Sequence, residues 1–123
     1  MASLEQECAG YAWEQVRGLR NGTRKAYKNL AKSMPALVMT NGLMQTLAFL
    51  KGKGGKEHEA LLSHIVGWLQ RAHVVEPNAA DFTSVMEWWG SGACTTWRYQ
   101  QATEQALQVL RWIRYFADAL EED

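Results

Sequence analysis

Lysine and arginine side chains without neighbouring acids are the strongest chemical signal in this sequence. Residues 17–56 contain nine basic residues and no Asp or Glu, whereas the whole chain of 123 residues has a formal net charge of zero. Such a segment favours an anionic partner, because phosphate groups convert the repulsion among like charges into attraction and release counterions. The candidate residues for nucleic-acid contact are Arg17, Arg20, Arg24, Lys25, Lys28, Lys32, Lys51, Lys53 and Lys56.

The first six of these candidates form a stripe if one continuous helix carries them. At 3.6 residues per turn, they fall within an arc of about 140°, opposite an apolar stripe on the same helix. Two other interpretations of the stripe remain open. It could be an ordinary solvated face, or a docking surface for an acidic protein.

The segment from Lys51 to Lys56, with three glycines between its lysines, is expected to be a flexible basic loop. Its composition is similar to that of phosphate-binding loops. However, no Ser or Thr follows Lys56, and a helix is expected before the loop where a P-loop has a strand. Contact between its lysines and a nucleic-acid backbone remains open beside the alternative of a solubilising turn.

The histidines and cysteines form no recognisable catalytic or metal-binding pattern. His58 and His64 are six residues apart, which puts them on opposite sides of a helix, and His73 is isolated. Neither Cys8 nor Cys94 lies in a nucleophile motif, and two cysteines are too few for a secreted disulfide scaffold. No apolar run is long enough to span a bilayer. We therefore expect a cytoplasmic protein that is not an enzyme and has no cofactor, metal or membrane contact.

Six tryptophans are many for a chain of this length, and two of them are adjacent. Trp88 and Trp89 point about 100° apart on a helix, so both cannot face one core. Because tryptophan is enriched at protein interfaces, we treat this pair as interface candidates. Burial in the core is the alternative for tryptophans as a group.

The periodicity of the sequence predicts an all-α fold, with residues 1–123 forming a single helical domain of about five or six helices. The apolar stripe crosses Asn21-Gly22 without losing phase, which favours one long first helix from Ser3 to about Lys32. Two helices joined at Gly22 are the alternative. Pro35 is expected to break the chain and open the next helix. Further helices are expected at 43–51, 57–71, 81–89 and 95–120, and Asp81 can cap the third of these. The last helix is long and carries a 3–4 apolar seam. The helix at 57–71 is amphipathic, and its apolar face consists of Leu61, Leu62, Ile65, Trp68 and Leu69.

The stretch from Pro35 to Leu50 resembles the signature of a known family. Its motif is matched by Pro35, Asn41-Gly42-Leu43, Gln45 and Ala48-Phe49-Leu50, and Arg17, Arg24, Tyr27 and Lys32 look like counterparts of an earlier family helix. Met34 stands where the family more often has Leu. The family is the small helical subunit of the type III-B CRISPR effector, the RNA-guided Cmr complex. The close match covers about sixteen residues, and the C-terminal half matches only in length and helical character.

The resemblance implies a non-catalytic protein of antiviral defence, present in several copies. These copies would stack head to tail in a filament beside the guide-bearing subunits, and their basic faces would help to hold the target RNA and the guide–target duplex. Other subunits of the complex would bind the guide and cut the target. The second interpretation is a free-standing DNA-binding regulator, in which the turn at Asn41-Gly42 joins two helices as in a helix-turn-helix. Against this, the segment after Gly42 is too apolar to lie in a major groove.

Overall fold

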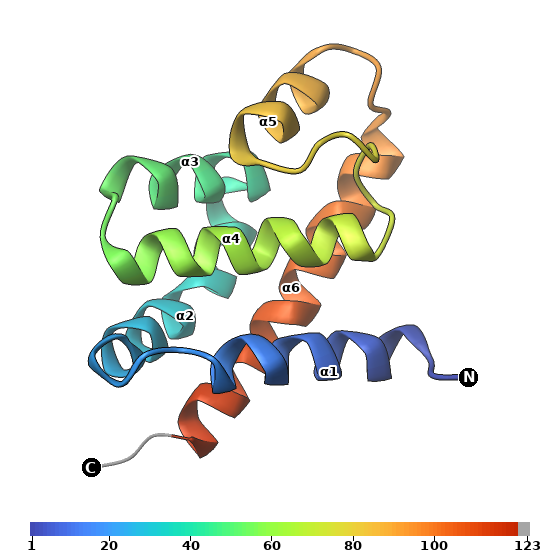
Figure 1. Cartoon of the computed structure of the whole chain (residues 1–123). Coiled ribbons are helices and arrows are strands. Elements are labelled where there is room, and N and C mark those ends of the chain that lie inside the picture. The colour runs from blue at the N-terminus through green and yellow to red at the C-terminus, as the bar shows by residue number, and fades with distance from the viewer. Residues whose placement is uncertain (121–123) are drawn as a thin grey trace.

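The computed structural model of the chain describes residues 1–120, apart from the side chain of Asn21. Over that range every regular element is an α-helix, which confirms the all-α prediction, and the helices share one hydrophobic core (Figure 1). The six helices are α1 (Leu4–Arg17), α2 (Asn21–Asn41), α3 (Leu43–Lys53), α4 (Lys56–Arg71), α5 (Phe82–Gly90) and α6 (Thr96–Ala119).

Helix α6 is the longest of the six, with 24 residues, and the fold is arranged around it. It lies behind α4 and α1 in Figure 1 and packs against α1, α2 and α4. Its buried seam contains Ala102 and Ala106, whose small side chains let neighbouring helices approach closely, followed by Val109 and Ile113. The 3–4 spacing in the sequence therefore identified the buried face of this helix correctly.

Helix α4 presents a central apolar surface that α1, α2, α3 and α6 cover. The face predicted for this segment is buried throughout and consists of Leu61, Leu62, Ile65, Trp68 and Leu69. The indole N–H of Trp68 donates to Oε1 of Gln105 on α6 at 3.1 Å, so this buried polar atom has a partner.

The starts of α5 and α6 also agree with the sequence. Asp81 caps α5 by accepting a hydrogen bond from the backbone N–H of Ser84, and Thr95 caps α6 by accepting one from Arg98. Side-chain oxygens at these positions satisfy backbone donors that have no partner within the helix. Helix α5 packs mainly on α3, at the edge of the molecule.

The prediction of one continuous first helix is wrong. Helix α1 ends at Arg17, and α2 begins at Asn21, so the break precedes Gly22, the site of the two-helix alternative. The backbone of Arg20 is extended, which turns the chain between the two helices. Both α1 and α2 pack on α6, and one straight helix would not cover the same surface. An apolar stripe shows which residues face a core, but not whether the helix axis changes direction between them.

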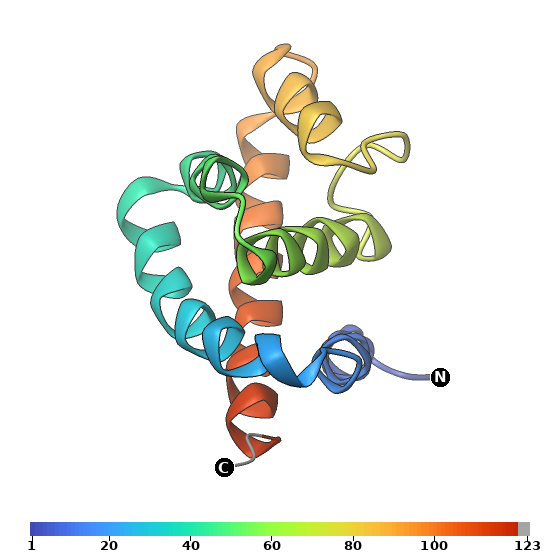
Figure 2. The same cartoon turned by 60° about the vertical axis from the view of Figure 1, so that its left-hand side comes forward.

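The prediction that Pro35 opens a helix is also wrong, because Pro35 lies inside α2. Proline removes one backbone donor and crowds the preceding turn, and such helices bend. Figure 2 shows that α2 curves along its length. The buried side chains of Met34 and Val38 flank the proline, so core packing holds the two halves of α2 together. The turn at Asn41-Gly42 was predicted correctly. Gly42, with φ of +87°, is the N-cap of α3.

Three polar side chains meet inside the core where α1, α2 and α4 pack together. The Tyr11 hydroxyl donates to the backbone oxygen of His64 at 2.7 Å, and the Tyr27 hydroxyl lies 2.8 Å from His64 Nδ1. Burial raises the pKa of Tyr27 and lowers the pKa of His64 from 6.5 to about 4. Both groups are therefore neutral near pH 7 and share one hydrogen bond.

Acidification should destabilise the protein through His64. The unfolded chain takes up a proton near pH 6.5 but the folded protein only near pH 4, so this contribution is complete above pH 6.5 and disappears as the pH falls toward 4. The loss should be roughly 2–3 kcal/mol between about pH 7.5 and pH 4.5. Denaturant unfolding at both pH values would measure it. His64→Asn, which keeps an acceptor and does not titrate, should lose less, and an equal loss would exclude His64 as the cause.

Replacement of a core leucine should cost far more than replacement of a half-buried one. Leu47 is fully buried, so Leu47→Ala should lower the free energy of unfolding by roughly 2–5 kcal/mol. Leu30 lies at the edge of the same core, and Leu30→Ala should cost less. Urea denaturation of both variants would test this, and equal costs would contradict the assignment of Leu47 to the core.

Candidate nucleic-acid interface

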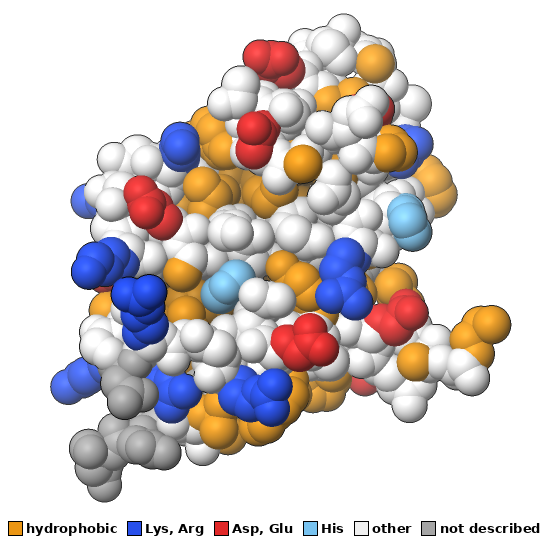
Figure 3. Space-filling model, viewed as in Figure 1, with side chains coloured by type: hydrophobic (Ala, Val, Ile, Leu, Met, Phe, Trp, Pro, Cys, Tyr) orange, Lys and Arg blue, Asp and Glu red, His pale blue; other side chains and the backbone are white. Residues whose placement is uncertain are grey.

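Two basic segments that are separate in the sequence lie at one end of the molecule. Residues 17–32 cover the junction of α1 and α2, and residues 51–56 cover the junction of α3 and α4. Both junctions lie on the left in Figure 1 and come forward together in Figure 2. Figure 3 shows Lys and Arg side chains gathered along this edge. The nine candidate residues at these two junctions are called the basic end below.

The junction of α3 and α4 is a tight turn, which corrects the prediction of a flexible loop from Lys51 to Lys56. Lys51 and Lys53 belong to the end of α3, and Lys56 begins α4. The two helices therefore hold these lysines on regular backbone. Because their backbone positions are fixed, less conformational freedom is lost when the lysines bind a partner.

The two glycines of this turn differ in their backbone conformation and surroundings. Gly54 has φ of +68°, in the left-handed region that ends many helices and that other residues rarely adopt. A Cβ at Gly55 would lie 2.7 Å from Glu57 Oε1 and 2.7 Å from His58 Nδ1, so these two side chains would have to move to make room for it. The two glycines thus join α3 to α4 through a short turn.

Seven of the nine basic side chains are exposed. These are Arg17, Arg20, Lys25, Lys32, Lys51, Lys53 and Lys56. The break after Arg17 divides the predicted stripe, so its six members no longer follow a single helix. They still share one end of the molecule, because the turn between α1 and α2 keeps the two helix ends together.

Arg24 and Lys28 are engaged within the fold. The Arg24 guanidinium donates to the backbone oxygens of Leu19, at 3.2 Å, and Arg17, at 3.1 Å, so it satisfies carbonyls where α1 ends. Lys28 is only 9% exposed, and its Nζ lies 3.2 Å from a carboxylate oxygen of Asp118 near the end of α6. These two residues connect α2 to the end of α1 and to α6. Their charges are therefore less available to a bound partner than those of the exposed residues.

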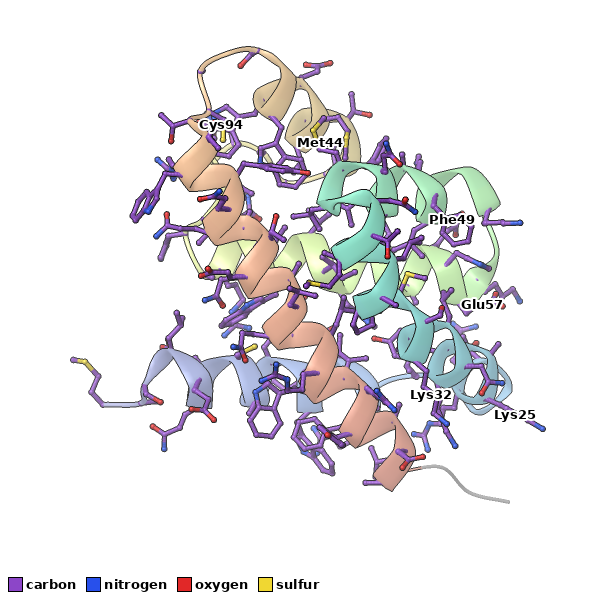
Figure 4. The ribbon with its side chains drawn as sticks, turned by 180° about the vertical axis from the view of Figure 1, so that it is seen from behind. Lys25, Lys32, Met44, Phe49, Glu57 and Cys94 are labelled. Atoms are coloured by element: carbon purple, nitrogen blue, oxygen red, sulfur yellow. The ribbon has the colours of Figure 1, made fainter. Side chains whose placement is uncertain are left out.

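Acidic residues also lie at the basic end. Figure 4 shows Glu57 with Lys25 and Lys32 at the same edge of the molecule. Glu57 and Glu59 occupy the first turn of α4, where the helix dipole favours negative charge. The Glu57 carboxylate lies 3.7 Å from His58 Nδ1. The surface is therefore predominantly cationic with an acidic side chain at its edge.

The adjacent tryptophans do diverge, as expected for neighbours on one helix. Trp89 is 8% exposed and packs edge-to-face on Tyr99, whereas Trp88 is half-buried beneath the Arg98 guanidinium. Only Trp88 of this pair presents surface, and α5 lies away from the basic end (Figure 1). The most exposed tryptophan is Trp97, at 66%, which the helical pattern did not single out because it precedes the buried seam of α6.

Neither cysteine is prepared for chemistry. Burial raises the pKa of Cys8 to about 12 and also raises the pKa of Cys94, so both thiols keep their protons near neutral pH. Among residues 1–120, no three His, Cys, Asp or Glu side chains are grouped so that they could hold a metal ion. Within the same range, no helix has the length and apolar character needed to cross a membrane.

Comparisons with known proteins give a consistent result. Residues 4–120 match the family model described as CRISPR-associated protein (Cas_Cmr5). The chain is 30% identical over 127 aligned positions to the CRISPR system Cmr subunit Cmr5 of Thermus thermophilus, with 100% of both chains covered. It is also similar to the crystal structure of a CRISPR-associated Cmr5 family protein from the same species. That match has a TM-score of 0.75 at 27% identity and covers 99% of this chain and 100% of the other.

Substitutions within the basic end should separate structural cations from exposed ones. Lys28→Ala should lower the free energy of unfolding by about 1–2 kcal/mol, because it removes a buried stem and the partner of Asp118. Lys25→Ala changes an exposed residue of the same helix and should shift stability by less than about 0.5 kcal/mol. Chemical denaturation of the two variants would measure the difference, and indistinguishable stabilities would show that the Lys28 contacts contribute nothing.

Proposed function

The chain belongs to the Cmr5 family, the small subunit of the type III-B CRISPR Cmr complex, and we propose that its basic end supports the target RNA within that complex. Its partners as a Cmr5 subunit are the other Cmr subunits. The observation that carries the RNA contact is the presence of seven exposed cations from two separate segments at one end of the fold.

Contact at the basic end would be directed at the RNA backbone. Lysine and arginine pair with phosphates, and such contacts position a strand without reading its sequence. Sequence specificity in a guided complex comes from base pairing between guide and target. A subunit that adds affinity without selectivity therefore suits this role.

A positioning role without chemistry accords with the residues of the site. The protonated thiols of Cys8 and Cys94 are poor nucleophiles, and the basic end offers charge and shape. We assign guide binding and target cleavage to other subunits and place the protein in the cytoplasm with the complex.

Stacking of several copies would compensate for the weakness of a single site. One cluster of this size gives salt-sensitive affinity of roughly 10⁻⁴ to 10⁻⁶ M, and a row of copies increases it through effective concentration. The distribution of charge also offers a different contact for the basic end. Glu5 and Glu7 lie in the first turn of α1, at the far side of Figure 1 from the junction of α3 and α4. An acidic neighbour is therefore the competing occupant of the basic end.

A free-standing DNA-binding regulator is poorly supported. In a helix-turn-helix, the helix after the turn must enter the major groove. Helix α3 instead directs much of its surface into the core, where Leu43, Thr46, Leu47 and Leu50 are buried.

Removal of exposed cations should weaken capture of target RNA by the reconstituted complex. The variant Lys25→Ala/Lys32→Ala should fold, since both residues are exposed. Capture of target RNA by the variant complex should also depend less on salt concentration, because each lost phosphate contact reduces the counterion slope by about one. Filter binding across a salt series would measure both effects.

A matched control removes the same charge elsewhere. Arg71 is the last residue of α4 and Arg98 lies in the first turn of α6, and these helix ends lie opposite the basic end in Figure 1. Arg71→Ala/Arg98→Ala should leave the slope unchanged. If both variants lose RNA capture equally, the effect comes from net charge alone. If Lys25→Ala/Lys32→Ala lowers the number of copies in the complex while capture per copy keeps its salt slope, the basic end binds an acidic neighbour and the RNA proposal is wrong.

A further inference from the structure

An exposed aromatic ring lies among the lysines of the basic end. Phe49 is 38% exposed, although Leu47 and Leu50 beside it in α3 are fully buried. More than a third of the Phe49 side chain is therefore accessible at the surface, where it can contact a partner. Figure 4 shows Phe49 on the side of the molecule that also carries Lys25 and Lys32.

Charged and polar groups contact this ring directly. The Lys53 ammonium nitrogen lies 5.6 Å from the ring centroid, a cation–π contact. The His58 imidazole packs against the ring at an interplanar angle of 67°, with the two ring centroids 6.1 Å apart. An aromatic side chain within a cationic surface is the combination that proteins use to bind single-stranded nucleic acids.

We propose that Phe49 is a stacking platform for an unpaired RNA base at the basic end. This inference rests on the proposed function and names the part of the RNA that the site would recognise. Lys53 is exposed and belongs to the last turn of α3, so its flexible side chain can move from the ring to a neighbouring phosphate when a base enters. The base then stacks on the ring, while the lysines hold the backbone on either side.

The fold holds the ring in a fixed position. Burial of Leu47 and Leu50 fixes the helical turn that carries Phe49. The tight turn at Gly54 and Gly55 brings the start of α4, and with it His58, against the ring. A ring that is already ordered loses little conformational freedom when a base stacks on it. The entropic cost of binding is therefore lower than it would be for a mobile side chain.

A protein partner for Phe49 is less consistent with its surroundings. The buried centres of protein interfaces are depleted in charged residues, and lysine is disfavoured there. Here Lys53 covers the ring and Lys51 and Lys56 flank the turn. Burial of these ammonium groups against an apolar partner would cost their hydration, whereas phosphates would pair with them.

The test compares single-stranded and duplex RNA of the same length, labelled for fluorescence anisotropy, at low ionic strength with the full chain. Phe49→Leu keeps an apolar side chain of similar size but removes the aromatic face. It should weaken single-strand binding by at least about fivefold and leave duplex binding unchanged. Its salt slope should equal that of the wild type, because stacking releases no counterions. Phe49→Tyr should restore binding.

Two controls make the outcome decisive. Trp97→Leu removes an exposed aromatic ring from the start of α6, which lies at the other side of the molecule in Figure 1, and should change nothing. Lys51→Ala/Lys53→Ala should flatten the salt slope.

If the lysine variant loses RNA while Phe49→Leu does not, the basic end binds RNA but the stacking proposal is wrong. If neither variant loses RNA, the proposed function itself fails. If Phe49→Leu instead lowers incorporation into the reconstituted complex at unchanged RNA affinity, the ring contacts protein and the proposal is overturned.

Discussion

Burial against α6 is the constraint on which the rest of this structure depends. Its seam of Ala102, Ala106, Val109 and Ile113 can be removed from water only if other helices cover it, and α1, α2 and α4 all do so. One straight helix would cover only part of that surface. The chain therefore turns after Arg17, and α2, which contains Pro35, curves along its length (Figure 2).

The same packing decides which cations serve the fold and which face solvent. Arg24 satisfies the carbonyls where α1 ends, and Lys28 connects α2 to Asp118 near the end of α6. Both interactions exist because the two helix ends meet there. The exposed cations lie around these contacts. The interactions that connect the helices and the candidate binding surface therefore occupy the same end of the molecule. This proximity explains why the charge of the segment could not be interpreted residue by residue from spacing alone.

The junction of α3 and α4 links the core to the candidate RNA surface. Gly54 and Gly55 form a short turn that places Lys53 of α3 and His58 of α4 against the Phe49 ring. In the sequence, this junction follows the stretch from Pro35 to Leu50 that resembles the family signature. The arrangement accords with a subunit that orients a bound strand while other subunits carry out chemistry.

The sequence by itself determined the helical class, the buried faces of α4 and α6, the cap at Asp81, and the family. These features follow from periodicity and local hydrogen bonding, which involve residues close together in the chain. Only the tertiary structure decided where α1 ends, that Pro35 stays within a helix, and that Lys28 is buried whereas Lys25 is exposed. Each of these outcomes depends on contacts with a helix distant in sequence. A helical pattern indicates on which side of the helix axis each side chain lies. The path of that axis through the fold is set by the free energy of burying the helix against its neighbours.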